Sequence, residues 1–212
     1  MDLYLKNLNP SFERKGDISE VWNTNVTFSS TNKRYLIKAA SGKGKTTLQK
    51  ILHGSYESYQ GDVIFDGRPI STFDNDAIAK FRAEIASFVF QDLRLFPFLT
   101  AMQNVMAKNE LTQFKSEKEV EGYFDALDLN DLIHRSCGEM SYGQQQRVAI
   151  VRSLCQPFLF LICDEPFSHL DDNNIQKACS LLEQELSDRE ASLIMLSLDH
   201  GYSFQYSEQI KL

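Results

Sequence analysis

Apolar and polar positions along this chain follow two rhythms, one typical of strands and the other of helices. Strand-like alternation and short apolar runs predict strands at 3–7, 21–29, 35–39, 87–90, 158–163 and 192–196. The run at 158–163, FLFLIC, is apolar throughout and therefore predicts a buried strand. An Asp66-Gly67 pair predicts the turn of a hairpin.

The helical spacing predicts helices in TTLQKILHG, which stops at Gly54, in DNDAIAKFRAEI, within 100–154 and at 174–186. Ser116 and Glu119 have the spacing of a capping box, which marks a helix start. Strands alternate with helices on both sides of the long helical stretch, and no linker or repeat divides the chain. The pattern predicts one compact α/β domain with a parallel-sheet core and a helical insert.

Composition narrows the classes of function. The 212 residues, 42% of them apolar, suffice for one well-filled core. A net charge of −7 and a pI near 5.1 argue against a nucleic-acid partner, which requires a basic surface. The N-terminus does not resemble a signal peptide, and the longest apolar run is far below the roughly 20 residues of a spanning helix. Four scattered cysteines predict reduced, structural thiols in the cytosol.

The segment KAASGKGKTT follows a predicted strand, precedes a predicted helix and matches the phosphate-loop pattern G-x-x-x-x-G-K-[ST], except that Ala39 replaces the first glycine. Its glycines let backbone N–H groups approach phosphate oxygens. Lys45 would contact the β- and γ-phosphates, and the Thr46 hydroxyl would bind magnesium. The expected nucleotide contacts are Ser41, Gly42, Lys43, Gly44, Lys45, Thr46 and Thr47. The alternative is a lysine-rich turn that caps a helix.

Two carboxylates, Asp164 and Glu165, follow the buried run at 158–163. Ligands of parallel sheets bind at this carboxyl edge. There Asp164 would hold magnesium through water, and Glu165 would act as general base toward the attacking water. Taken alone, D-E-P at a strand end is often just a turn. Together with the phosphate loop, it predicts a nucleotide-hydrolysing site.

The segment MSYGQQQRVAIVRSL begins a helix, because Ser141 and Gln144 have capping-box spacing. It resembles the L-S-G-G-Q signature and following helix of the ATP-binding cassette (ABC) ATPases, and the resemblance covers essentially the entire chain in order. FVFQDLRLFPFLTAMQNV resembles the Q-loop, in which Gln91 joins the two lobes and senses the γ-phosphate and magnesium. SHLDD resembles the D-loop, with Asp171 carried over, and Phe12 falls near the family's adenine-stacking aromatic residue.

The resemblance implies a P-loop NTPase fold with a RecA-like parallel-sheet core, an N-terminal antiparallel β subdomain and an inserted α-helical subdomain. It also implies a single nucleotide-binding domain over 1–212. The core lobe would take about 1–90 and 156–212, and the helical insert about 91–155.

The resemblance further implies an ATPase subunit that uses ATP and Mg²⁺ and acts on separate transmembrane permease subunits from the cytoplasmic face of the membrane. Two copies would associate head to tail, so that Ser141, Gly143 and Gln144 of one chain contact the γ-phosphate held by Lys45 of the other. The groove formed by 91–109 would receive the partner's coupling helix. The motifs look most like those of the lipoprotein-release, macrolide-export and cell-division group.

Three positions depart from the family pattern. We expect Ala39 to be tolerated unless the turn demands a positive φ. Tyr142 replaces the first signature glycine and would weaken nucleotide binding if its backbone needs a positive φ or the phosphate approaches closely. With Asp199 aligned to the family's aspartate, Leu198 takes the place of a histidine that contacts the γ-phosphate. His200, two residues on, is the candidate substitute.

The motifs assign the catalytic roles to Glu165, Gln91 and His200 and the metal contacts to Thr46, Gln91 and Asp164. Because leucine cannot hydrogen-bond a phosphate, hydrolysis is expected to be slow. The alternative function is an ATP-gated scaffold or regulatory cassette with little or no hydrolysis. A cassette of DNA repair or translation would need coiled-coil or zinc insertions or a second cassette, and a P-loop kinase would leave the signature helix without a purpose.

Overall fold

A computed structural model describes residues 1–11, 19–198 and 201–212, so the candidate residues Phe12 and His200, and Asp199, lie outside the described residues. The strands are β1 (Asp2–Pro10), β2 (Asn25–Ser29), β3 (Arg34–Lys38), β4 (Tyr59–Phe65), β5 (Arg68–Pro69), β6 (Ala86–Val89), β7 (Phe160–Asp164), β8 (Ser192–Ser197) and β9 (Glu208–Lys211). The α-helices are α1 (Lys45–Leu52), α2 (Asn75–Lys80), α3 (Ala101–Asn109), α4 (Glu117–Ala126), α5 (Tyr142–Leu154) and α6 (Asp172–Asp188).

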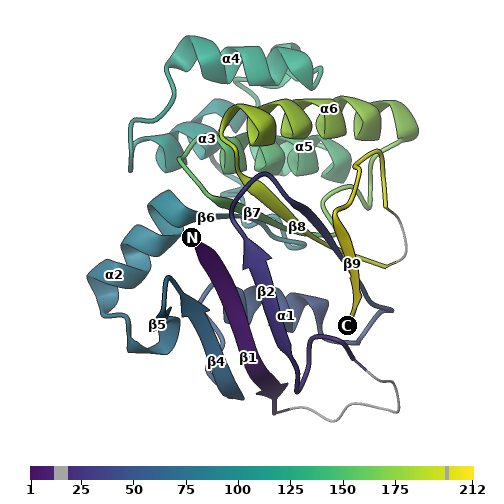
Figure 1. The fold of residues 1–212 in the computed structure, drawn as a ribbon. Helices are drawn as coiled ribbons and strands as arrows, with labels where there is room; N and C mark the ends of the chain where they lie inside the picture. The colour runs from purple at the N-terminus through teal and green to yellow at the C-terminus, as the bar shows by residue number, and fades with distance from the viewer. Residues whose placement is uncertain (12–18, 199–200) are drawn as a thin grey trace.

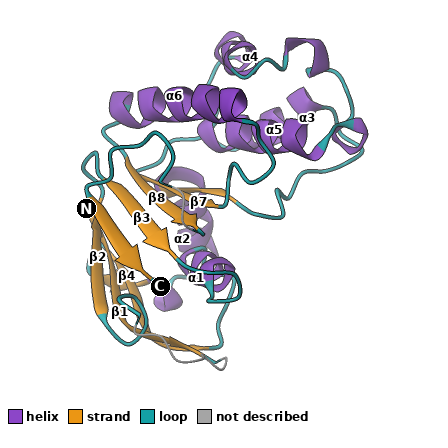
Figure 2. Ribbon diagram, turned by 90° about the vertical axis from the view of Figure 1, so that its right-hand side faces the viewer, coloured by secondary structure: helices purple, strands orange, loops and turns teal. Residues whose placement is uncertain are grey.

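The strands form two sheets. A parallel sheet has the order β6-β7-β8-β3-β9, and an antiparallel sheet from the N-terminal part has the order β2-β1-β4-β5. Helices α3 to α6 gather over one side of the parallel sheet, and the antiparallel sheet lies toward the other side (Figure 1). Figure 2 shows the same arrangement from a second direction. The predicted fold class, a parallel core with an N-terminal antiparallel sheet and inserted helices, is confirmed.

Alternate residues of the parallel sheet pack into two different hydrophobic clusters. Phe160 and Ile162 of β7 join α1 and the antiparallel sheet, whereas Leu161 and Cys163 join the cluster of α3 to α6. This follows from the two-residue period of a strand. Both faces of β7 are therefore covered, as its continuous apolar run predicts. Because the second cluster continues from β7 into α4 without a break, the division into core lobe and helical insert stays a prediction.

Short-range sequence signals account for several element ends. Ser116 and Ser141 each form the predicted capping box at the start of α4 and α5. Asp66 and Gly67 have φ of 49° and 78° and join β4 to β5 as the predicted hairpin turn. Gly54, with φ 70°, directly follows the residue that caps the C-terminus of α1.

Two strand predictions differ from the structure. The strand predicted at 21–29 begins only at Asn25, because Val21 and Trp22 lie in a turn whose N–H groups both donate to Ser19 Oγ. Their apolar side chains are buried from that turn, and so they imitate a strand pattern. Strand β9 has no prediction behind it, since Ile210 is its one buried residue and its pairing with β3 supplies the remaining order.

Two predictions from composition also meet the structure. Within the described residues, no helix has both the length and the apolar character that crossing a membrane requires. The four cysteines are free and buried, which confirms the prediction of structural thiols. Burial raises the pKa of each of these thiols.

Candidate functional site

The segment between β3 and α1 has the backbone of a phosphate-binding loop. Gly42 and Gly44 have φ of 76° and 101°, in the left-handed region that favours glycine. A Cβ at Gly42 would meet open space, so the backbone angle and not crowding requires glycine there. Gly44 is the N-cap of α1, and no side chain caps this helix end. The first N–H groups of α1 can therefore bind an anion.

Lys45 directs its ammonium group back across the loop. Its Nζ donates to Ala39 O at 2.7 Å and to Ala40 O at 3.3 Å, and it lies 3.5 Å from Glu165 Oε1. The side chains of Lys45 and Glu165 are 9% and 8% exposed. Each charge compensates for the burial of the other. The loop thus holds a cation next to a carboxylate at the carboxyl edge of the parallel sheet.

Thr46 connects α1 to the end of β7. Its hydroxyl oxygen lies 2.6 Å from Asp164 Oδ2 and 3.2 Å from Gln91 Oε1. Asp164 is fully buried, and its Oδ1 has no hydrogen-bond partner in the described part of the chain. Burial raises the pKa of Asp164, and the hydrogen bond from Thr46 acts in the opposite direction. An unpaired buried carboxylate oxygen is costly unless a ligand completes the site.

These three oxygen donors fit Mg²⁺, which prefers oxygen ligands and takes one or two carboxylates together with phosphates of the substrate. Among the described residues, no cluster of three or more His, Cys, Asp or Glu side chains could hold a metal by itself. A magnesium ion at Thr46 and Asp164 would therefore depend on phosphate oxygens.

Glu165 follows β7 with φ 48°, a backbone conformation uncommon for a residue that carries a side chain. Its N–H donates to Leu196 O at 3.0 Å, and its carbonyl accepts from Gln146 Nε2 at 3.2 Å. Such conformations cluster at functional sites, where the surrounding structure maintains them. Here β8 and α5 hold the main chain so that the carboxylate reaches Lys45.

One pocket collects most of the predicted nucleotide contacts. It is lined by the predicted residues Ser41, Gly42, Gly44, Lys45, Thr46, Thr47, Gln91 and Glu165. Lys43 lines a neighbouring hollow instead. Tyr56, Ser168 and His169 also line the pocket, and the sequence analysis assigned them no role. Ser168 and His169 stand within the D-loop segment SHLDD, which was a usable signal, whereas nothing in the sequence marks Tyr56.

A family model described as "ABC transporter" matches residues 23–168. The chain belongs to the ABC transporter family. The lipoprotein-releasing system ATP-binding protein LolD of Syntrophotalea carbinolica is 32% identical over 78% of this chain and 74% of its own length. The glucose import ATP-binding protein GlcV of Saccharolobus solfataricus is 29% identical over 98% of this chain, which spans 59% of that protein.

The macrolide export ATP-binding/permease protein MacB of Pasteurella multocida is 35% identical over 69% of this chain and 23% of its own length. The solved dimer of the cassette MJ0796, in a post-hydrolysis state with ADP and Pi, superposes with a TM-score of 0.77 and 25% identity over 93% of this chain and 88% of that chain. These likenesses confirm the predicted ABC-type ATPase, including LolD and MacB among its relatives.

The signature and D-loop residues of this ABC cassette lie outside its own pocket. Ser141 and Gln144 form the capping box of α5. Asp171 caps α6 by accepting from Asn174 N at 2.8 Å, and this bond lowers the pKa of Asp171. Both motifs thus begin helices within one chain, so their predicted contact with nucleotide would need a second copy and stays a prediction.

Tyr142 fits the signature of the ABC cassette without a special backbone. It is the first residue of α5 and is absent from the described residues with positive φ. Its hydroxyl donates to Gln91 O at 2.7 Å, and its ring lies 4.3 Å from the His169 ring between centroids. Of the two conditions under which Tyr142 would weaken binding, the demand for a positive φ is not met. The side chain instead ties the signature to the Q-loop and D-loop of the same chain.

Leu198 presents an apolar side chain where the ABC family has a histidine. The side chain is 46% exposed and lines the nucleotide pocket. It offers no hydrogen bond to a phosphate. His200, the candidate substitute, lies outside the described residues, and its role stays a prediction.

Ala39 lies at the end of β3, and it is not among the described residues with positive φ. Its N–H donates to Ser197 O at 3.0 Å, and its carbonyl accepts from Lys45 Nζ. Its side chain is 5% exposed and belongs to the hydrophobic cluster around α1. The condition that would have made alanine costly, a demand for positive φ, is absent.

Ala39→Gly is therefore expected to keep ATP affinity within about tenfold of the wild type, or about 1.4 kcal/mol. Glycine removes a buried methyl group and adds freedom to the unfolded chain, so Tm should fall by roughly 2–4 °C per kcal/mol lost. Titration calorimetry and thermal unfolding measure the two effects. Tighter ATP binding by more than tenfold would contradict this ranking.

Gly143→Ala is expected to lower stability and disturb the D-loop. A Cβ at Gly143 would lie 2.7 Å from His169 O, a main-chain atom that cannot swing aside. Overpacking of this kind costs about 1–3 kcal/mol. Thermal unfolding measures the loss. Gly122→Ala in α4 is the matched control, because nothing lies within 4 Å of its Cβ and alanine favours the helix. Equal Tm values for the two variants would contradict the crowding at Gly143.

Proposed function

We propose that this cassette is the ATP-hydrolysing subunit of a membrane transport complex and that its pocket binds ATP with Mg²⁺. One observation carries the proposal. Lys45 meets Glu165 at 3.5 Å, and Thr46 meets Asp164 at 2.6 Å, at the same edge of the parallel sheet. This arrangement brings together a phosphate-binding cation, a metal-binding pair and a candidate base.

Each side chain has a distinct task in this proposal. The ammonium group of Lys45 and the N–H groups that open α1 bind the β- and γ-phosphates. Thr46, Gln91 and Asp164 hold the magnesium ion, whose charge neutralises phosphate oxygens when it is bound. Glu165 takes the proton of the attacking water. Leu198 supplies no bond to the γ-phosphate, and we therefore expect slow turnover.

We further propose that two cassettes associate head to tail, with Ser141, Gly143, Gln144 and Asp171 of one chain completing the pocket of the other. The position of these residues outside their own pocket supports this arrangement. The dimeric structures of MJ0796 support it as well. An ATP-bound dimer would then separate after hydrolysis, because ADP lacks the γ-phosphate that joins the two chains.

Complementation in trans tests the composite site. A Lys45→Met chain lacks the phosphate-binding lysine, and a Ser141→Arg chain obstructs the signature. If the pocket is shared head to tail, mixing the two inactive chains restores ATPase activity, because each mixed dimer contains one intact loop facing one intact signature. Absence of activity in a mixture whose mixed dimers are seen by native mass spectrometry would reject the shared pocket.

The partner on the membrane side is proposed to be a separate permease subunit. The cassette would lie peripherally at the cytoplasmic face of the membrane, and the groove along 91–109 would receive the permease's coupling helix. Relatives named for lipoprotein release and macrolide export support such a complex.

A second candidate function rests on Leu198, whose apolar side chain lines the pocket. A cassette that closes on ATP and hardly hydrolyses it would serve as a scaffold or regulator. Steady-state ATPase assays of the wild type and of Glu165→Gln, with the membrane partner present, separate the two functions. Equal background rates in both proteins would favour the scaffold.

A further inference from the structure

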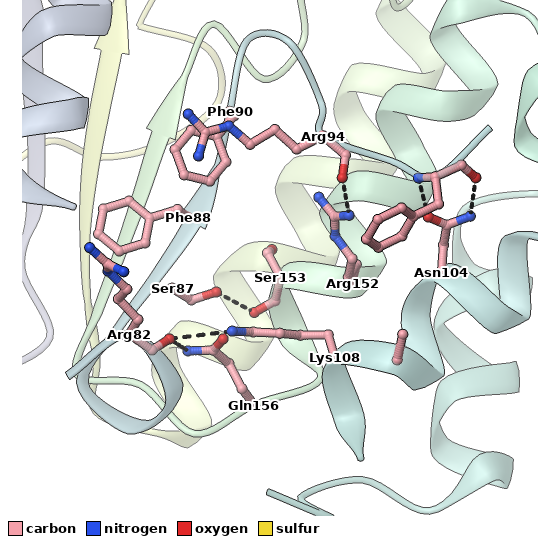
Figure 3. Close-up of a pocket in the computed structure, with 12 residues that line it drawn as sticks. Arg82, Ser87, Phe88, Phe90, Arg94, Asn104, Lys108, Arg152, Ser153 and Gln156 are labelled. Atoms are coloured by element: carbon pink, nitrogen blue, oxygen red, sulfur yellow. Dashed lines mark hydrogen bonds between the residues drawn. The ribbon is translucent and has the colours of Figure 1, made fainter. Parts of the chain in front are cut away.

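A second pocket lies between β6 with its following segment on one side and α3 and α5 on the other (Figure 3). It shares no described lining residue with the nucleotide pocket. Four cations line it: Arg82, Arg94, Lys108 and Arg152. They come from four different segments of the chain, which the fold brings together around one hollow.

These cations have no carboxylate inside the pocket. None of its described lining residues is Asp or Glu. Arg82, Lys108 and Arg152 donate to main-chain carbonyl groups at 2.6 to 3.3 Å. Arg94 approaches the exposed Asp92 at 3.4 Å, outside the lining. Carbonyl groups orient the guanidinium and ammonium groups but leave their charge uncompensated.

The cations also repel one another. Burial lowers the pKa of Lys108, and the charge of Arg152 acts in the same direction. Burial and the charge of Arg94 likewise lower the pKa of Arg82. The pKa of the neighbouring His53 falls to about 4 through burial and the nearby cations. In a chain with a net charge of −7, such a concentration of positive charge favours an anionic ligand.

The rim of this pocket is aromatic. Phe96 and Phe98 are 50% and 76% exposed, with ring centroids 6.1 Å apart. Inside, the Arg94 guanidinium lies 3.6 Å from the centroid of the Phe90 ring. Exposed aromatic side chains beside a charged hollow are typical of an interface that receives an amphipathic helix.

We propose that this pocket binds an acidic amphipathic helix of the membrane subunit, with its carboxylates on Arg82, Lys108 and Arg152 and its apolar side chains on Phe96 and Phe98. The inference rests on the proposed function and adds the chemistry of the partner's helix. Carboxylates that enter the pocket would compensate cations from both sides of it. Binding would thereby join β6 and its following segment to α3 and α5.

Site-specific photocrosslinking identifies the occupant. A p-benzoylphenylalanine at position 98 of the full chain, expressed in its own cells, is irradiated in intact membranes, and the crosslinked peptide is sequenced. The expected peptide is a cytoplasmic loop of a membrane protein with at least two carboxylates within about two helical turns of the crosslink. A crosslinked loop without carboxylates, or a crosslink to lipid, overturns the proposal.

Charge reversal tests the role of the cations. Lys108→Glu in the crosslinkable chain is expected to lower the crosslink yield at least about tenfold. Lys80→Glu is the control, since it makes the same change of charge on a side chain that is 71% exposed and does not line the pocket. A Glu→Lys change in the identified loop should restore the yield with Lys108→Glu.

The same variants separate this inference from the proposed ATPase. ATP hydrolysis by the isolated chain should be unchanged in Lys108→Glu, because Lys108 lies outside the nucleotide pocket. Equal crosslink yields for Lys108→Glu and Lys80→Glu would overturn the acidic helix while leaving the ATPase in place. If inorganic phosphate binds the wild type and not Lys108→Glu while the crosslinks ignore charge, the pocket is a small-anion site and the proposal fails.

Discussion

Glu165→Gln is expected to lower the steady-state ATPase rate by at least about 100-fold, because glutamine cannot accept the proton of the attacking water. Glutamine has nearly the same shape, and the main-chain bonds of residue 165 to Leu196 and Gln146 do not involve the side chain. Lys45 keeps its bonds to Ala39 O and Ala40 O. ATP binding should therefore persist, and an ATP-bound dimer should accumulate. Phosphate release and light scattering measure the two outcomes.

Glu121→Gln is the matched control, since Glu121 is exposed on α4 and the same charge is removed far from the pocket. Its ATPase rate should equal that of the wild type. Wild-type turnover by Glu165→Gln would exclude Glu165 as the base. A lost rate together with lost ATP binding would instead show that Glu165 holds the loop through Lys45.

Lys45→Met and Lys43→Met are expected to differ widely, although the two lysines stand two positions apart in the same loop. Lys45 Nζ is buried at the pocket with Glu165 3.5 Å away, so its removal leaves Glu165 without its cation and the phosphates without a partner. Removing one member of such a pair typically costs about 2–5 kcal/mol, or roughly 30-fold or more in affinity.

Lys43 lines the neighbouring hollow, and an exposed charge at that distance contributes about 0–1 kcal/mol. ATP affinity of Lys43→Met should therefore stay within about fivefold of the wild type. Titration with a fluorescent ATP analogue measures both affinities at one ionic strength. If the two variants lose affinity equally, general positive charge and not the geometry of Lys45 binds the nucleotide.

The sequence predicted those parts of the site whose chemistry is local. A glycine loop between strand and helix, two carboxylates after an apolar run and two capping boxes all depend on residues within a few positions of one another. The structure accordingly shows the loop glycines with positive φ, Asp164 and Glu165 at the end of β7, and Ser116 and Ser141 at their helix starts.

Other features could not be predicted, because they arise between distant segments. Tyr142 looked like a defect of the signature, yet its hydroxyl reaches Gln91 O across 51 positions of sequence. The cation pocket is likewise invisible in sequence, since Arg82, Lys108 and Arg152 follow no common period. An apolar turn at 21–22 imitated a strand, because burial alone does not specify a backbone conformation.

The sequence by itself determined the family, the fold class and the chemistry of each motif, because periodicity, caps and backbone freedom are properties of short segments. Only the tertiary structure decided which motifs meet. Thr46 and Asp164 are 118 positions apart and touch because the parallel sheet places the carboxyl ends of β3 and β7 at one edge. Contacts of this kind depend on how strands are ordered and faces are packed, and residue spacing carries no record of either.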